Sequence, residues 1–184
     1  DTYVLVSTGF VQTSSAGWAS AALSPDGAHV YFAPVNKTAI LKIEVATNTV
    51  SSFGSITGVN KYFSSINVGD FVYMMGDGAT SYLKLDTTTD SISFITGVGG
   101  NSASCLVGSN KIISSKYVAT YSVFDIDTEI TTSYALAGGN MWGATLGIDG
   151  RVYFSSYGGT SQYAALTKQT INKNLPLSRY NNKY

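Results

Sequence analysis

The chain has 184 residues, a length typical of one domain, and its 11 basic and 11 acidic side chains leave no net formal charge. A neutral chain gives no electrostatic reason to bind nucleic acid or an anionic membrane, so neither partner is expected. Cys105 is the one cysteine, which excludes a disulfide within the chain, and no stretch approaches the 18 consecutive apolar residues that predict a membrane span.

The first predicted strand is Tyr3–Ser7, which precedes any repeated pattern. The first repeat unit, residues 17–59, contains "HVYFAPV" from residue 29 and "AILKIEV" from residue 39. Both segments are rich in β-branched and aromatic residues, which favours strands. "SPDG" before the first of them and "TNT" after the second have the composition of tight turns. Unit one is therefore predicted to be a four-stranded antiparallel meander.

The same pattern returns in residues 60–99, 100–139 and 140–175. Val30, Val72, Ile112 and Val152 follow one another at spacings of 42, 40 and 40 residues. "ILKIEVATNTVSSF" is matched by "YLKLDTTTDSISFI" and "YSVFDIDTEITTSY", whereas unit four lacks its outer strand. Asp149-Gly150 is predicted to form a two-residue hairpin turn with positive φ at Gly150. Four-stranded units that repeat at about 40 residues predict a β-propeller with one blade per unit.

We therefore predict an all-β, propeller-like domain of four four-stranded antiparallel blades over residues 1–184, with a C-terminal tail at 176–184 and no helix. Tyr3–Ser7 is expected to pair in the last blade and close the ring, which would remove exposed strand edges. Four blades make a small ring, so an open arc completed by another copy is the alternative.

Unit one reads Trp18, then "LSPDG", "VYFAP", "ILKIE" and "TNTVSSFG". This resembles the propeller-type repeat W…LAPNGKIYxIP…VLxIDxxTNTV…FG of phage tail and virion proteins and of some bacterial surface proteins. The match is weaker in units two and four and poorest in unit three, which lacks the aromatic and the Asp-Gly. The ending "LPLSRYNNKY" resembles the LSxYxNK ending of such phage proteins through Leu177, Ser178, Tyr180, Asn182 and Lys183. The resemblance implies a virion or surface protein.

The sequence offers no catalytic or metal-binding constellation. His29 is the one histidine and opens a strand, so no triad with a histidine base can be argued, and a zinc site is not expected. Most carboxylates fall in predicted turns, which accounts for them without catalysis. Asp125, Asp127 and Glu129 alternate along one stretch but lack the glycine and distal glutamate of a calcium loop. We expect no cofactor and no metal.

Aromatic side chains that open the units are the candidate ligand-binding residues. Trp18, Tyr62 and Trp142 stand at the start of units one, two and four, whereas unit three has Ser102. If they converge on one face of the ring, they form an aromatic rim suited to sugar faces or a protein partner. The alternative is that they cap the packing between blades.

Two functions follow from these observations. The first is a non-catalytic structural or binding module, not an enzyme, on a virion or extracellular surface, as a phage tail, fibre or decoration component. Its partners would be other virion or surface proteins, a host glycan or receptor, and further copies of itself in a homo-oligomeric or multi-copy assembly. The second is a propeller-fold glycan hydrolase or lyase, which requires two carboxylates, or a carboxylate and a tyrosine, in a shared pocket.

Overall fold

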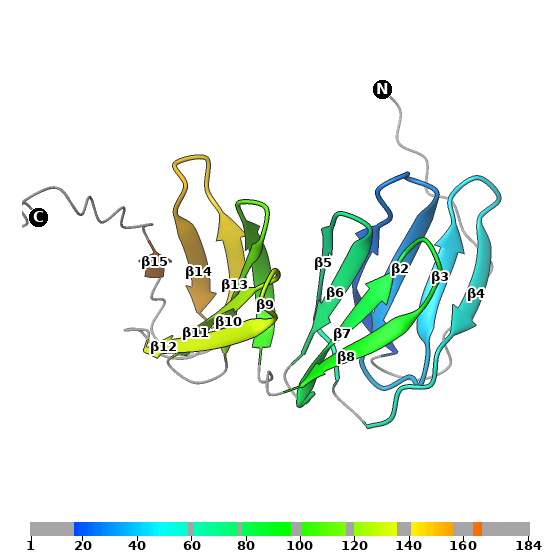
Figure 1. The fold of residues 1–184 in the computed structure, drawn as a ribbon, viewed down its shortest axis with the longest axis horizontal. Coiled ribbons are helices and arrows are strands. Elements are labelled where there is room, and N and C mark those ends of the chain that lie inside the picture. Colours follow the sequence, from blue (N-terminus) through cyan, green and yellow to red (C-terminus); the bar gives the residue numbers. More distant parts are fainter. Residues whose placement is uncertain are drawn as a thin grey trace, which may run out of the picture.

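The computed structural model describes residues 17–58, 61–76, 79–96, 101–116, 120–135, 141–156 and 164–166. These residues form four antiparallel sheets, each a meander in chain order (Figure 1). We call the sheets blades 1 to 4. Blade 1 contains β1 (Trp18–Leu23), β2 (His29–Pro34), β3 (Ile40–Glu44) and β4 (Thr49–Phe53). Blade 2 contains β5 (Ser64–Val68), β6 (Phe71–Met75), β7 (Ser81–Asp86) and β8 (Ile92–Thr96). Blade 3 contains β9 (Asn101–Val107), β10 (Lys111–Lys116), β11 (Thr120–Asp125) and β12 (Ile130–Ala135). Blade 4 contains β13 (Met141–Leu146), β14 (Val152–Ser156) and β15 (Ala164–Leu166).

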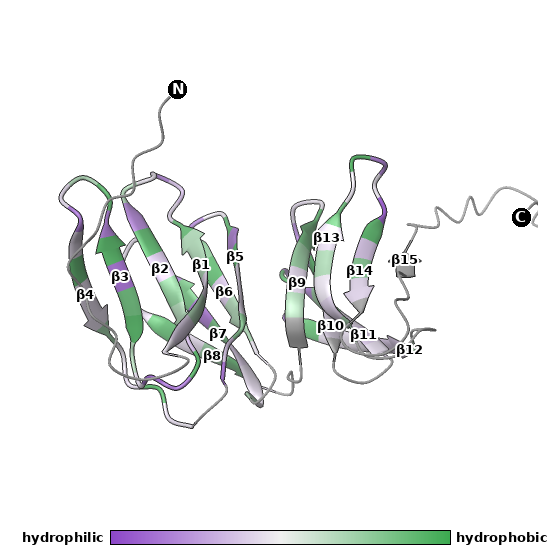
Figure 2. Cartoon of the chain, turned by 180° about the vertical axis from the view of Figure 1, so that it is seen from behind, coloured by the Kyte–Doolittle hydropathy of each residue, from purple (hydrophilic) through white to green (hydrophobic). Residues whose placement is uncertain are grey.

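The predicted all-β, propeller-like fold is confirmed. The first strands of the blades lie side by side, β1 against β5, β5 against β9 and β9 against β13, and no comparable contact joins β13 to β1 within the described residues. Blade 1 therefore lies at one end of the molecule and blade 4 at the other (Figures 1 and 2). The described blades form an open arc. The strand predicted at Tyr3–Ser7 and the tail at 176–184 lie outside the described residues.

The blades pack face to face through the alternate residues of their strands. Figure 2 shows hydrophobic residues alternating with polar ones along several strands. One face of blade 1 packs on one face of blade 2, and the residues that meet there include Tyr31, Ala33 and Ile40 on blade 1 with Val72, Met74, Leu83 and Leu85 on blade 2. The opposite face of blade 2 packs on blade 3 in the same way. Each middle blade is thus buried on both faces. Successive side chains of a strand point to opposite faces of the sheet, so one strand can contribute to both interfaces.

The turn before β14 differs from the prediction in length. Gly150 has the expected positive φ of 77°, but the loop has three residues, Ile148 to Gly150. The N–H of Gly150 donates to the carbonyl of Gly147 at 3.0 Å, and the N–H of Gly147 donates to the carbonyl of Arg151 at 2.8 Å. This is the pattern of a three-residue hairpin, in which the last loop residue adopts the left-handed conformation. The two-residue turn was therefore wrong, and the glycine requirement was correct.

Replacing Gly150 with valine should destabilise the protein by about 1–3 kcal/mol, because a β-branched residue is strained at positive φ. No heavy atom lies within 4 Å of the added Cβ, so the cost reports the backbone alone. Urea denaturation of Gly150→Val and Gly150→Asn compares a β-branched side chain with one that tolerates positive φ. Asparagine tolerates the left-handed region and should cost less than valine. Equal midpoints for wild type and Gly150→Val would contradict the assignment of this turn.

Blade 3 replaces apolar core residues with serines that meet a tyrosine from blade 2. Ser114 and Ser122 are fully buried, at strand positions where blade 2 has Met74 and Leu83. The hydroxyl of Tyr82, itself fully buried, hydrogen-bonds Ser122 and Ser114 across the interface. Buried polar groups need hydrogen-bond partners. The two serines of blade 3 and the tyrosine of blade 2 provide these partners for one another.

Tyr82→Phe should cost about 1–3 kcal/mol, since it leaves buried serine hydroxyls without the tyrosine partner. Tyr134→Phe is the matched control, because Tyr134 is exposed, and a surface change of this kind stays within about 0.5 kcal/mol. Guanidinium denaturation of both variants measures the difference. A Tyr82→Phe protein as stable as the control would show that the hydroxyl network contributes nothing to stability.

Candidate functional site

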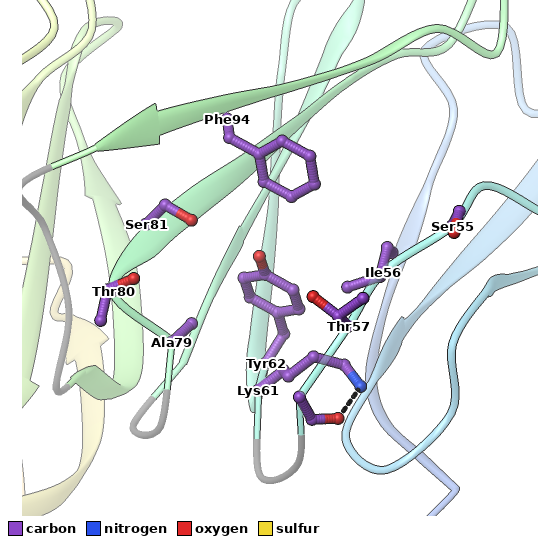
Figure 3. Close-up of a pocket in the computed structure, with 10 residues that line it drawn as sticks. Ser55, Ile56, Thr57, Lys61, Tyr62, Ala79, Thr80, Ser81 and Phe94 are labelled. Carbon is purple, nitrogen blue, oxygen red and sulfur yellow. Dashed lines mark hydrogen bonds between the residues drawn. The ribbon is translucent and has the colours of Figure 1, made fainter.

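A pocket of about 470 Å³ lies between blades 1 and 2, at the end of the sheets where the chain passes from β4 to β5 (Figure 3). We call it the inter-blade pocket. Three segments form it, namely the connection after β4, the residues before β5, and the β6–β7 loop with the start of β7; Phe94 of β8 completes it. Its lining residues are Ser55, Ile56, Thr57, Gly58, Lys61, Tyr62, Ala79, Thr80, Ser81 and Phe94.

Lys61 supplies the one cationic side chain of this lining. It is only 3% exposed, and its Nζ donates to the carbonyl of Gly58 at 2.7 Å (Figure 3). Burial lowers the pKa of Lys61, because a low-dielectric surrounding disfavours the ammonium. Its backbone is held by the N–H of Lys61, which donates to the carbonyl of Val35 in blade 1 at 3.1 Å. An ammonium fixed at the wall of a pocket can bind a carboxylate or another anion.

Aromatic rings and hydroxyls complete the pocket. The side chain of Tyr62 points into it from below Phe94, and Phe94 is 48% exposed, so its ring remains open to a ligand (Figure 3). The Tyr62 hydroxyl hydrogen-bonds Ser81, and burial raises the pKa of Tyr62, which keeps this group neutral. The remaining walls carry the hydroxyls of Ser55, Thr57 and Thr80. The lining is more polar than apolar, with one exposed aromatic ring and one cation, a composition that suits a polar ligand with an apolar face.

The three residues of the predicted aromatic rim do not lie in equivalent environments. Tyr62 is only 2% exposed and belongs to the core between blades 1 and 2 as well as to the pocket. Trp18 is half-buried, and its Nε1 donates to the carbonyl of Ala39 at 2.9 Å. Trp142 is also half-buried. Packing therefore accounts for Tyr62, whereas Trp18 and Trp142 keep part of their surface open and their ligand-binding role stays a prediction.

Register explains why Trp142 is not the structural equivalent of Trp18. Trp18 pairs with Pro34 at the end of β2, and the equivalent pair in blade 4 joins Met141 to Ser156. Trp142 therefore lies one residue beyond the position equivalent to Trp18, within a register shift between Met141 and Gly143, and blade 1 has a matching shift between Trp18 and Ala21. The side chain of Ser102 lies outside the described residues.

A second pocket, of about 440 Å³, lies at the opposite end of the same two blades and is acidic. We call it the acidic pocket; its lining residues are Pro25, Asp26, His29, Lys42, Asp70, Thr87, Thr88 and Asp90. Lys42 donates to Asp90 at 2.6 Å, and the Tyr31 hydroxyl donates to the same carboxylate at 2.9 Å. Hydrogen bonds from the Ser24 hydroxyl and the Ala28 N–H lower the pKa of Asp26. His29, the one histidine, is half-buried and lines this pocket.

Within the residues that the structure describes, no group of three or more His, Cys, Asp or Glu side chains could hold a metal ion. Asp125, Asp127 and Glu129 instead serve the turn between β11 and β12 and its contacts. Asp125 accepts from the N–H of Asp127, and Glu129 accepts from Lys84 of blade 2 at 2.8 Å. The same part of the chain contains no helix long and apolar enough to cross a membrane.

No protein-family model and no curated protein matches the sequence. Solved structures match the fold. They include hydrazine synthase of Kuenenia stuttgartiensis, with a TM-score of 0.69 and 13% identity over 86% of this chain and 49% of that one. Virginiamycin B lyase from Staphylococcus aureus follows, with a TM-score of 0.64 and 14% identity over 86% of this chain and 58% of that one. The WD40 repeats of RRP9 give a TM-score of 0.62 and 10% identity over 79% of this chain and 46% of that one.

The chain spans about half the length of the solved proteins that it matches. At identities this low the likeness concerns the fold alone. The matches support the propeller part of the resemblance seen in the sequence, and the resemblance to phage tail and virion proteins stays a prediction. The chain has the fold of a β-propeller.

Proposed function

We propose that this chain is a non-catalytic binding module of a virion or an extracellular surface, and that its inter-blade pocket takes a saccharide carrying a carboxylate. The observation that carries the proposal is the buried ammonium of Lys61 in the same pocket as the open ring of Phe94. The virion or surface location rests on the resemblance of the repeat and of the C-terminal ending.

The chemistry of the pocket favours this ligand class over a purely apolar or a nucleic acid ligand. An aromatic ring offers a flat apolar surface to the carbon face of a sugar. The hydroxyls of Ser55, Thr57 and Thr80 match sugar hydroxyls as donors and acceptors. A carboxylate on the sugar compensates the desolvated ammonium of Lys61 with a charge-assisted hydrogen bond. A chain of zero net charge gives no overall electrostatic attraction for a polyanion such as nucleic acid.

Titration calorimetry with an acidic oligosaccharide containing a uronic or sialic acid, and with its neutral counterpart, tests the proposal. Lys61→Met removes the ammonium and keeps the volume, so affinity for the acidic ligand should fall about 10- to 100-fold with the neutral ligand unaffected. Phe94→Ser should weaken both ligands. Ile130→Ser, an exposed residue of blade 3, is the control and should change neither.

The pH profile provides a second measurement. The pKa of Lys61 is lowered from 10.5, so the ammonium loses its proton at a lower pH than an exposed lysine would. The acidic ligand binds the charged form; its binding is therefore complete below this lowered pKa and is lost as the pH rises through it. Binding that persists in Lys61→Met, or that shows no dependence on the ligand's carboxylate, would refute the proposed ligand class.

The acidic pocket supports a second candidate, a glycan hydrolase or lyase. It brings Asp26, Asp70 and His29 into one pocket, the kind of grouping that such an enzyme needs. The lowered pKa of Asp26 keeps that carboxylate ionised, and Asp70 and His29 lie in the same pocket as side chains that could transfer a proton. A turnover assay on the polysaccharides that bind decides between the two. Turnover that is lost in Asp26→Asn and His29→Gln would replace the non-catalytic proposal, and no turnover by the wild type would eliminate the enzyme.

A further inference from the structure

One face of blade 4 is covered by no described blade, and it carries a tyrosine at a position where blades 1 and 2 bury one; we call it the free face of blade 4. Tyr31, Tyr73 and Tyr153 occupy the same repeat position in the second strands of blades 1, 2 and 4. Tyr31 is 0% exposed and Tyr73 is 1% exposed, because the next blade covers each of them. Tyr153 is 37% exposed and lines a shallow pocket with Gly143 and Thr145. Blade 4 thus presents the surface that blades 1 and 2 use to hold a following blade.

Blade 1 presents the complementary surface. Val72, Met74, Leu83 and Leu85 form the face of blade 2 that packs on blade 1, and all four are fully buried. Their repeat equivalents in blade 1 are Val30, Phe32, Leu41 and Ile43. Of these, Leu41 is buried, and Val30, Phe32 and Ile43 are half-buried. This face of blade 1 therefore matches the receiving side of a blade–blade interface, and no described blade occupies it.

The ion pairs between neighbouring blades are also compatible with joining blade 4 to blade 1. Between blades 1 and 2, Lys42 binds Asp90 at 2.6 Å, and the equivalent pair between blades 2 and 3 joins Lys84 to Glu129 at 2.8 Å. Lys42 and Lys84 stand opposite Tyr31 and Tyr73 in the strand pairing, and the residue opposite Tyr153 is Ala165.

The acceptor of this pair sits in the turn before each fourth strand. Asp90 and Glu129 adopt positive φ there, and their equivalent in blade 1 is Asn48, with φ 57°. Where blade 4 lacks the lysine, blade 1 lacks the carboxylate. Joining the two ends would bury no unpaired charge at this point.

We infer that the free face of blade 4 packs on the free face of blade 1 of a second copy of this chain, so that two copies close a ring of eight blades. Each contact is head-to-tail and repeats the interface that joins blades 1 and 2. Two such contacts related by a two-fold axis close the assembly. The chain matches about half the length of solved propellers, 49% of hydrazine synthase and 58% of virginiamycin B lyase, as an arc that fills half of a ring would.

Sedimentation velocity on the 184-residue chain tests the inference. The wild type should sediment with twice the 19.4 kDa mass of one chain. Tyr153→Lys and Phe32→Glu, which place a charge on either free face, should each shift the protein to a monomer, with dissociation constants raised at least tenfold. Tyr134→Glu, on the exposed surface of blade 3, is the matched control and should leave the dimer intact. Circular dichroism of every variant shows whether the strands are retained.

Mixing the two variants gives the sharpest result, because a head-to-tail contact pairs the altered face of one copy with the altered face of the other. An equimolar mixture of Tyr153→Lys and Phe32→Glu places lysine against glutamate at one interface and leaves the second interface wild type. The mixture should therefore recover the dimer. A monomeric wild type, an open-ended polymer, a dimer indifferent to both substitutions, or folded single variants that fail to recover on mixing would each overturn the inference.

Discussion

Gly76→Ala should destabilise this protein by about 3 kcal/mol or more, well beyond the cost of any surface substitution. A Cβ at this position would lie 1.3 Å from the carbonyl oxygen of Lys61 and 2.7 Å from the Cα of Tyr62, and both are backbone atoms that cannot rotate away. Blade 2 admits the segment before β5 only because residue 76 has no side chain. Chemical denaturation followed by circular dichroism measures the loss.

Gly69→Ala provides the comparison for this prediction. Gly69 has a φ of 55°, and nothing lies within 4 Å of an added Cβ, so alanine pays only for the left-handed backbone, about 1 kcal/mol. Gly76→Ala must therefore cost clearly more than Gly69→Ala. Because the clash involves Lys61, the same substitution should also weaken ligand binding in the inter-blade pocket. Equal stabilities for the two variants would show that the segment before β5 is not packed as described.

Phe124→Ala should lose about 3–5 kcal/mol, since it opens a cavity where blades 2 and 3 meet. The ring of Phe124 is fully buried, with its centroid 5.2 Å from that of Tyr82 in an edge-to-face arrangement and 5.8 Å from that of Tyr73. Phe124→Leu retains most of the volume and should cost about 1.5 kcal/mol or less. Thermal unfolding monitored by calorimetry measures both.

Phe94→Ala is the control for the phenylalanine change. Phe94 is exposed, so its truncation should stay within about 1 kcal/mol of the wild type while still affecting the inter-blade pocket. If Phe124→Ala were as mild as Phe94→Ala, the two middle blades would not be packed on each other through this ring.

The blades could be predicted from the sequence because their information is local and repeated. Val30, Val72, Ile112 and Val152 were placed in second strands from spacing alone, and they lie in β2, β6, β10 and β14. Turn composition located the hairpins as well, although the turn at Gly150 has one residue more than predicted. Strand period and turn chemistry act over a few residues, so a single sequence contains both.

The pockets could not be predicted in this way, since they arise where separate blades meet. Lys61 reads as one of eleven basic residues, and only the packing of its backbone against Gly76 and Val35 shows that it is buried. Phe94 sits in an outer strand where an exposed aromatic gives no signal of its own. Trp142 was matched to Trp18 by residue type, whereas strand pairing gives Met141 the position of Trp18, and a single sequence does not show this pairing.

The open arc has a consequence for how cooperatively this protein holds together. Among the described residues, the main contacts between first strands join β1 with β5, β5 with β9 and β9 with β13, as in a linear array of repeats. In such an array the inner members gain stability from two neighbours and the terminal members from one. Opening therefore starts at blade 1 or blade 4 and proceeds inward, and blades 2 and 3 are the last to lose their protection. Joining the two ends would remove both weak points at once and turn a protein that frays into one that unfolds as a unit.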